Sequence, residues 1–251
     1  PMDPGATLLL GFGTCIAGSL LCGLANGTMV IGLGVHPFII TLGTMWMLRG
    51  VAFVISRAES ILVPSALTSV AKAPLGLGTA LYPVPLIVML AVTIAGSVYL
   101  RRTVMGRHIF AIGGNVEASR FSGLNVNRIK LGVFVLSGLA AGIAAFLGAA
   151  FYGSATSSDA NGYELYVIAS AVVGGASLTG GKGSAVSAML GAVLIVMIRQ
   201  AIRTLHLDQN YEWIIIGGAM ILAVVLDQGG TKLVARRLAS VAGPPRAANQ
   251  P

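Results

Sequence analysis

Residues 106–130 read GRHIFAIGGNVEASRFSGLNVNRIK, a polar and basic stretch that interrupts long apolar runs on both sides. Its cations, together with two arginines just before it, are Arg101, Arg102, Arg107, Arg120, Arg128 and Lys130. In a membrane protein, positive charge in a short loop marks the cytosolic side. The stretch therefore predicts a cytosolic loop, which we assign to residues 101–130 and which orients every membrane span around it.

The composition indicates an integral membrane protein. Hydrophobic residues make up 55% of the 251 residues and charged residues 10%, whereas soluble domains carry about 25% charged residues. The 34 glycines are typical of membrane helices that approach one another closely. A net charge of +8 suggests nucleic acid as the partner of a soluble protein. Here the cations gather beside apolar segments, which favours contact with anionic membrane lipid and no nucleic-acid partner.

The predicted fold class is all-α, a polytopic bundle of transmembrane helices. Apolar segments predict about seven spans, at residues 7–33, 37–56, 82–100, 131–151, 165–179, 184–205 and 211–226. The segment 165–179 is short for a full span and is expected to be tilted or broken. The loops at 57–81 and 153–164 carry few cations and are predicted to be external. We therefore expect a transmembrane domain over residues 1–227 and a basic, disordered cytosolic tail over residues 228–251.

A short helix is predicted inside residues 106–130, held between two turns. Asn115 is a favourable N-cap residue, and Glu117 falls in the first turn, where the helix dipole favours an anion. The flanking turns are expected at Gly113-Gly114 and Ser122-Gly123. On these residues alone, a solvated connecting loop and a surface that docks a partner are equally good interpretations.

Several classes of activity are excluded. Residues 176–184, ASLTGGKGS, nearly match a phosphate-binding loop, but Ala176 and Gly183 replace the glycine and the hydroxyl residue that the motif needs. The three histidines are far apart, so we expect no catalytic residue and no metal site. The carboxylates fall in loops or at span ends, which argues against a proton-driven carrier. Cys15 and Cys22, about 10 Å apart along one helix, are interpreted as packing residues.

The chain resembles the permease subunits of ribose-, arabinose- and xylose-type ATP-binding-cassette importers. The stretch 106–130 carries this resemblance together with HPFIITLGTMWMLRG at 36–50, GYELYVIASAVVGGASLTGGKGS at 162–184 and AVVLD at 223–227. In that family, the region of residues 106–130 supplies a coupling helix that sits in a cleft of the ATPase subunit. The ATPase-coupling residues implied by the resemblance are Arg107, Gly113, Gly114, Asn115, Glu117, Arg120, Ser122 and Gly123.

The resemblance also implies the setting of the chain. It is expected to be a multi-pass transport subunit of a bacterial inner membrane rather than an enzyme, without a cofactor of its own. ATP and magnesium are bound by the partner ATPase. Other expected partners are a second permease chain, identical or related, and a periplasmic or lipid-anchored sugar-binding protein. The family has about ten spans, so about three are expected to precede Pro1, which places both ends of the protein in the cytosol.

For the solute, the resemblance implies a translocation pathway for a monosaccharide or a similar polyol. Such a ligand needs hydroxyl or amide partners, and Thr41, Thr44, Ser170 and Ser177 are the candidates. Hydrogen bonding to neighbouring helices is an alternative role for each of them. Two other functions stay open: a permease for another solute, such as branched-chain amino acids, and a truncated, non-transporting membrane protein that only binds a partner.

Overall fold

The computed structural model describes residues 3–73 and 82–206 and, beyond these, 208, 210, 211, 213–215, 217–219, 221 and 225. The regular structure of the described part is helical apart from one pair of two-residue strands. The chain divides into two compact units, Pro1–Asn161 and Gly162–Pro251, and each is described by itself. The predicted tail, residues 228–251, lies outside the described residues.

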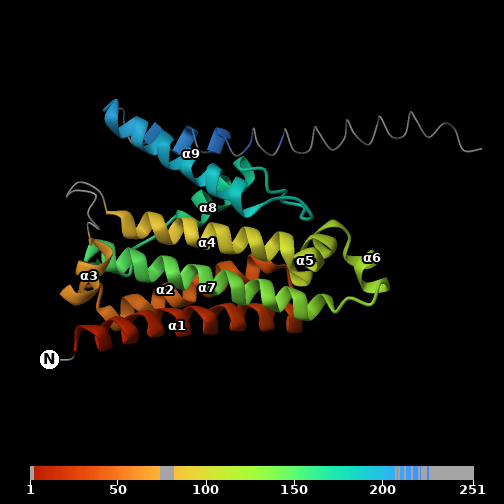
Figure 1. Ribbon diagram of the computed structural model, residues 1–251, viewed down its shortest axis with the longest axis horizontal. Coiled ribbons are helices and arrows are strands. Elements are labelled where there is room, and N and C mark those ends of the chain that lie inside the picture. Colours follow the sequence, from red (N-terminus) through yellow and green to blue (C-terminus); the bar gives the residue numbers. More distant parts are fainter. Residues whose placement is uncertain are drawn as a thin grey trace, which may run out of the picture. The chain divides into compact units, whose positions relative to one another are not determined.

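The first unit contains four long helices, α1 (Pro4–Leu33), α2 (Pro37–Ser56), α4 (Pro83–Arg102) and α7 (Val126–Tyr152), and three short ones, α3 (Ser65–Ala71), α5 (Val104–Gly114) and α6 (Val116–Phe121). Three long helices carry a proline in their first turn, where its missing N–H costs nothing. Figure 1 shows α3 at one end of α7, and α5 and α6 at the other. The predicted cytosolic stretch therefore occupies one end of this unit.

Close packing of α1 against α7 forms the centre of the first unit. A Cβ on Gly23 of α1 would lie 2.6 Å from the backbone oxygen of Phe134 on α7. A Cβ on Gly138 of α7 would lie 2.5 Å from the backbone oxygen of Ser19 on α1. Small residues on both sides thus let the two backbones touch, as is usual where membrane helices cross.

A short antiparallel strand pair joins two segments that are far apart in the sequence. In β1 (Ile61–Leu62) and β2 (Ser154–Ala155), Ile61 is opposite Ala155 and Leu62 is opposite Ser154. Both segments belong to loops predicted to be external, so their pairing agrees with the predicted topology. The strands themselves were not predicted, because two residues are too few to show an alternating pattern.

The second unit is built on α8 (Tyr163–Val173) and α9 (Ala185–Thr204). Tyr166, Ala169 and Ile195 form its buried core. Over the core, the guanidinium carbon of Arg199 lies 4.7 Å from the centre of the Tyr166 ring. Because α8 has 11 residues, it extends about 16 Å and does not span a bilayer core of about 30 Å. The prediction that this apolar segment is short is confirmed.

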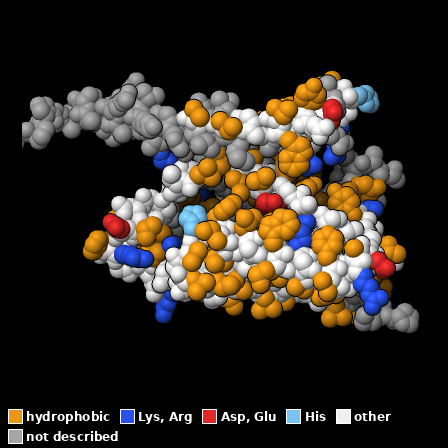
Figure 2. All heavy atoms as spheres, turned by 180° about the vertical axis from the view of Figure 1, so that it is seen from behind, with side chains coloured by type: hydrophobic (Ala, Val, Ile, Leu, Met, Phe, Trp, Pro, Cys, Tyr) orange, Lys and Arg blue, Asp and Glu red, His pale blue; other side chains and the backbone are white. Residues whose placement is uncertain are grey.

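Five helices of the described chain are long and apolar enough to cross a membrane: α1, α2, α4, α7 and α9. They match five of the predicted spans, α8 is the short sixth, and the seventh, residues 211–226, is described at 211, 213–215, 217–219, 221 and 225, all of which are helical. None of the residues in α2 is buried. Hydrophobic side chains are spread over the visible surface in Figure 2, as expected of helices that face lipid or another membrane chain.

Candidate functional site

The basic stretch is more helical than the sequence analysis predicted. The residues before Asn115 form the 11-residue helix α5, which begins where the hydroxyl of Thr103 accepts a hydrogen bond from the Gly106 N–H at 3.0 Å. Gly106 is buried, and a Cβ there would lie 2.6 Å from the backbone oxygen of Tyr99. The glycine thus allows α5 to fold back tightly against α4, and the loop predicted at this point is corrected to a helix.

An apolar face holds α5 against the start of α7. Ile112 of α5 and Val126 and Ile129 of α7 form a buried cluster, with Met105 and Ile109 packed against it. Met105, Ile109 and Ile112 recur at helical spacing, and this pattern was the signal that could have revealed α5. The polar residues Arg107 and His108 between them concealed it.

Asn115 ends α5 and begins α6. Its backbone N–H donates to the Ala111 oxygen at 3.0 Å, and its side-chain Oδ1 accepts from the Ala118 N–H at 2.9 Å. The predicted N-cap is therefore confirmed, as is Glu117 in the first turn. The predicted bend at Gly113-Gly114 is wrong, because both glycines are helical and the extended backbone of Asn115 makes the break. The turn at Ser122-Gly123 is confirmed, with Gly123 at φ 80°.

The outer surface of α6 is the most exposed part of this region. Arg120 and Glu117 are exposed, and 92% of the Phe121 surface is accessible. The opposite side is anchored, since Ser119 is buried and its backbone oxygen accepts from the Leu124 N–H at 3.1 Å. We call Gly114, Asn115, Glu117, Arg120, Phe121, Ser122 and Gly123 the α6 surface. Phe121 was missed by the sequence analysis, although an aromatic residue inside a basic, polar stretch was a visible signal.

The other predicted coupling residues lie on α5. Arg107 is exposed in its first turn, and Gly113 is half-buried in its last. Arg107 is therefore separated from the α6 surface by about two helical turns along α5, roughly 10 Å. The structure brings the residues of the α6 surface together, places Gly113 half-buried beside it, and leaves Arg107 at its margin.

Replacing Asn115 with alanine is expected to loosen α6 without unfolding the protein. The substitution removes the side-chain acceptor for the Ala118 N–H, and loss of an N-cap typically costs about 1 kcal/mol. Amide hydrogen exchange in residues 116–121 should become about fivefold faster. Hydrogen-exchange mass spectrometry measures this directly. Asn127→Ala, at an exposed position within α7, is the matched control, and equal acceleration in both variants would contradict the capping role.

Two of the predicted pathway residues lie one turn apart on α2. Thr41 donates only to backbone oxygens of its own helix, Pro37 and Phe38. Thr44 also donates to Asn26 Oδ1 of α1, at 2.7 Å. Thr44 and Asn26 line a groove of about 290 Å³ whose other walls are Leu21, Cys22, Ala25, Met47 and Leu48. Asn26 was missed, although it is a lone amide in an uncharged apolar run.

The other two predicted pathway residues lie in the second unit. Ser170 is buried and donates to the Tyr166 oxygen of its own helix at 2.6 Å. Ser177 lies in the turn between α8 and α9, where its hydroxyl is 2.9 Å from that of Thr179. The bond of Ser170 stays within its own helix, whereas the bond from Thr44 to Asn26 of α1 is of the kind that the alternative role describes, between neighbouring helices.

The glycine-rich turn of the second unit does not have the context of a phosphate-binding loop. A helix, α8, precedes it, whereas the motif follows a strand. The turn closes on itself through a bond from the Ser177 N–H to the Lys182 oxygen at 3.2 Å. In the described residues, no group of three His, Cys, Asp or Glu side chains is placed to hold a metal ion. Cys15 and Cys22 are both free thiols on α1.

The chain matches known membrane permeases over most of its length. The family model described as the permease component of a branched-chain amino acid transport system matches residues 2–224. The D-allose transport system permease protein of Escherichia coli strain K12 is 37% identical over 229 residues, 90% of this chain and 68% of that protein. The ribose import permease protein of the same strain is 36% identical over 206 residues, 82% of this chain and 64% of that protein.

A third relative, the L-arabinose ABC transporter permease protein of Azospirillum brasilense, is 34% identical over 218 residues, 85% of this chain and 63% of that protein. The chain thus spans about two thirds of the length of these relatives. No solved structure matches it. Since both the family model and these relatives cover most of the chain, it belongs to the family of permease components of ATP-binding-cassette transporters that includes these sugar permeases.

Proposed function

We propose that the chain forms part of the translocation pathway of an ATP-binding-cassette importer for a monosaccharide or a similar polyol. The observation that carries this proposal is the identity of 34–37% to permeases named for allose, ribose and arabinose, over 82–90% of the chain. The family membership makes the chain a transport subunit rather than an enzyme. Its proposed location is the inner membrane of a bacterial cell.

The energy for transport is proposed to come from a separate ATPase subunit that binds ATP and magnesium. The five spanning helices of the described chain contain no Asp or Glu, so within that part nothing is placed to relay protons across the membrane. A binding protein that delivers the sugar and a second permease chain complete the proposed assembly. Exposed apolar side chains on α2, such as Trp46 and Val54, are available to that second chain or to lipid.

The α6 surface is the proposed contact with the ATPase. A docked partner can bias a transporter only if its contacts differ between the outward-open and inward-open states. Motion of α6 passes to α7 through the bond between Leu124 and Ser119 and through the apolar cluster under α5. Because α7 is packed backbone to backbone on α1, a displacement of α6 moves a long pair of helices rather than a loop.

Asn26 and Thr44 are the proposed solute contacts in the first unit. Thr44 already donates to Asn26 Oδ1, and the amide nitrogen of Asn26 supplies two further donors that suit sugar hydroxyls. Thr41, Ser170 and Ser177 also remain proposed solute contacts. Thr41 and Ser170 are weaker candidates than Thr44, because their hydroxyls bond to backbone oxygens of their own helices.

A branched-chain amino acid is the second candidate solute, because the matching family model is described by such a transport system. Reconstitution distinguishes a sugar from a branched-chain amino acid as the solute. The permease, its cognate ATPase and its binding protein are placed in proteoliposomes, and ATP hydrolysis is measured with a panel of sugars and of branched-chain amino acids. Stimulation by one sugar supports the proposal, and stimulation by leucine or valine overturns it. ATP hydrolysis that no sugar and no amino acid stimulates favours the non-transporting alternative.

A further inference from the structure

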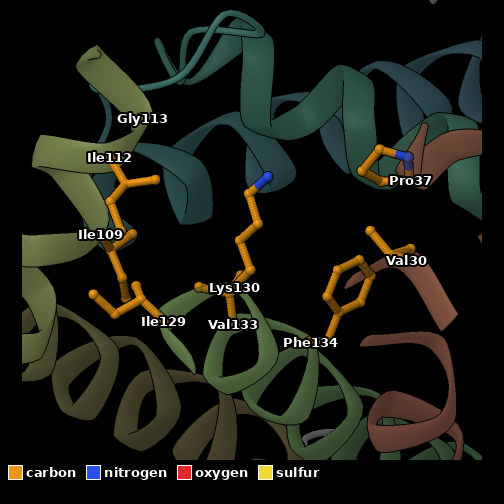
Figure 3. A pocket seen from close by; sticks show the side chains of 9 residues that line it. All are labelled: Val30, Pro37, Ile109, Ile112, Gly113, Ile129, Lys130, Val133 and Phe134. Atoms are coloured by element: carbon orange, nitrogen blue, oxygen red, sulfur yellow. The ribbon is translucent and has the colours of Figure 1, made fainter. Parts of the chain in front are cut away.

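An apolar groove of about 210 Å³ lies at the predicted cytosolic end of the first unit. Its walls come from α1, α2, α5 and α7, and its apolar side chains include Val30, Ile109, Ile112, Ile129, Val133 and Phe134. Figure 3 shows these side chains around a central opening. The groove borders the α6 surface at Gly113, which lines it, but it shares no residue with that surface or with the Asn26–Thr44 groove.

Lys130 supplies the only charge among the residues that line this groove. In Figure 3 its side chain extends from α7 into the opening, and its amine lies between the α5 wall and Pro37. No Asp or Glu is among the lining residues, and Lys130 forms no ion pair within the described residues. The half-buried Lys130 can pack its methylene stem along these apolar walls while its ammonium group stays open to an anion.

We propose that this groove binds one anionic phospholipid of the cytosolic leaflet, with an acyl chain along the apolar walls and the phosphate on Lys130. The position of Lys130 suits this ligand, because it is the last cation of the basic stretch and directly precedes the apolar part of α7, where lipid headgroups are expected. Basic pockets between membrane helices on the cytosolic side are typical sites for anionic lipid.

The lining residues favour a lipid over other ligands. A sugar needs several hydrogen-bonding partners, and the side chains that line the groove offer the Lys130 amine alone. Free phosphate would contact the amine but would leave the apolar walls unused. A phospholipid satisfies both parts, because its chain covers the isoleucine and valine side chains while its headgroup supplies the anion.

Lipid retention on the purified permease tests the proposal. The permease is reconstituted with equal amounts of phosphatidylglycerol and phosphatidylethanolamine, extracted in mild detergent, and examined by native mass spectrometry. We expect the wild type to retain one phosphatidylglycerol. Lys130→Gln should lower the ratio of retained phosphatidylglycerol to phosphatidylethanolamine about fivefold, the effect of one cation near an anionic surface. Arg128→Gln removes the same charge from an exposed position outside the groove and should leave the ratio unchanged.

A second variant and a competitor complete the test. Val133→Trp fills the groove while keeping Lys130, and should reduce retention of both lipids. Equal effects of Lys130→Gln and Arg128→Gln, equal retention of the two lipids by the wild type, or displacement of phosphatidylglycerol by millimolar inorganic phosphate would each overturn the proposal. The measurement involves neither solute nor ATPase, so its result is independent of the proposed transport function.

Discussion

Permease carrying Gly138→Leu is expected to be lost almost completely from the folded, monodisperse fraction. The Cβ of any residue at position 138 would lie 2.5 Å from the backbone oxygen of Ser19 and 3.3 Å from the Cα of Gly23. Both contacts are with backbone, so no change of rotamer can relieve them. Overpacking a close interface costs about 1–3 kcal/mol or more, and helices kept apart by a leucine also lose their remaining contacts.

The same helix offers the control for this experiment. Gly148 also lies on α7, but a Cβ there would meet nothing within 4 Å. Gly148→Leu therefore makes the same chemical change in the same helix without touching α1. Both variants are expressed as fluorescent fusions, and the monodisperse fraction is measured by size-exclusion chromatography. Similar yields of the two variants would show that α1 and α7 are not packed through Gly138.

Reversal of charge at Arg120 is expected to uncouple ATP hydrolysis from uptake. Arg120 is exposed on the α6 surface, beside Phe121 with 92% of its surface accessible. Arginine and aromatic residues are enriched at protein interfaces, where loss of one dominant side chain costs about 2 kcal/mol or more, about thirtyfold in affinity. Arg120→Glu and Phe121→Ala should each lower sugar uptake by at least about tenfold in reconstituted importer.

Gly114→Trp tests the same surface by bulk instead of charge. A Cβ at Gly114 would meet nothing within 4 Å, so the folded chain accommodates a large side chain and only a docked partner is obstructed. The readouts are co-purification of the ATPase, basal ATP hydrolysis and sugar uptake. Arg128→Glu, an equal charge change on the exposed first turn of α7, is the control. Unchanged uptake in both Arg120→Glu and Gly114→Trp would remove the α6 surface from the coupling mechanism.

The membrane spans were predictable from the sequence, because membrane insertion depends on the hydrophobicity summed over a segment of about 20 residues. The uncharged run at α1 and the proline at the start of α2 marked two spans directly. Asn115 was predictable for a different reason, since an N-cap acts on the N–H groups of its own helix and needs no knowledge of distant residues.

Features that depend on distant contacts were not predictable. Helix α5 owes its position to Gly106 against α4 and to Ile112 against α7, contacts that lie across turns of unknown geometry. The bond between Thr44 and Asn26 joins two helices whose relative rotation a single sequence does not define. Phe121 was visible as a residue, but its exposure depends on the burial of Ser119 on the other side of α6.

The pairing of α1 with α7 has a consequence for synthesis. Because α1 is made before α7, its glycine-lined side cannot pack on α7 until the ribosome has completed the segment from Pro37 to Phe121 and α7 has followed. During that interval α1 can contact α2, for example through Asn26 and Thr44, but the strand pair that joins Ile61 to Ala155 cannot yet form. The packing of α1 on α7 therefore forms late, after most of the first unit has been made. Nascent chains released before residue 126 should be recognised as incomplete by membrane quality-control proteases.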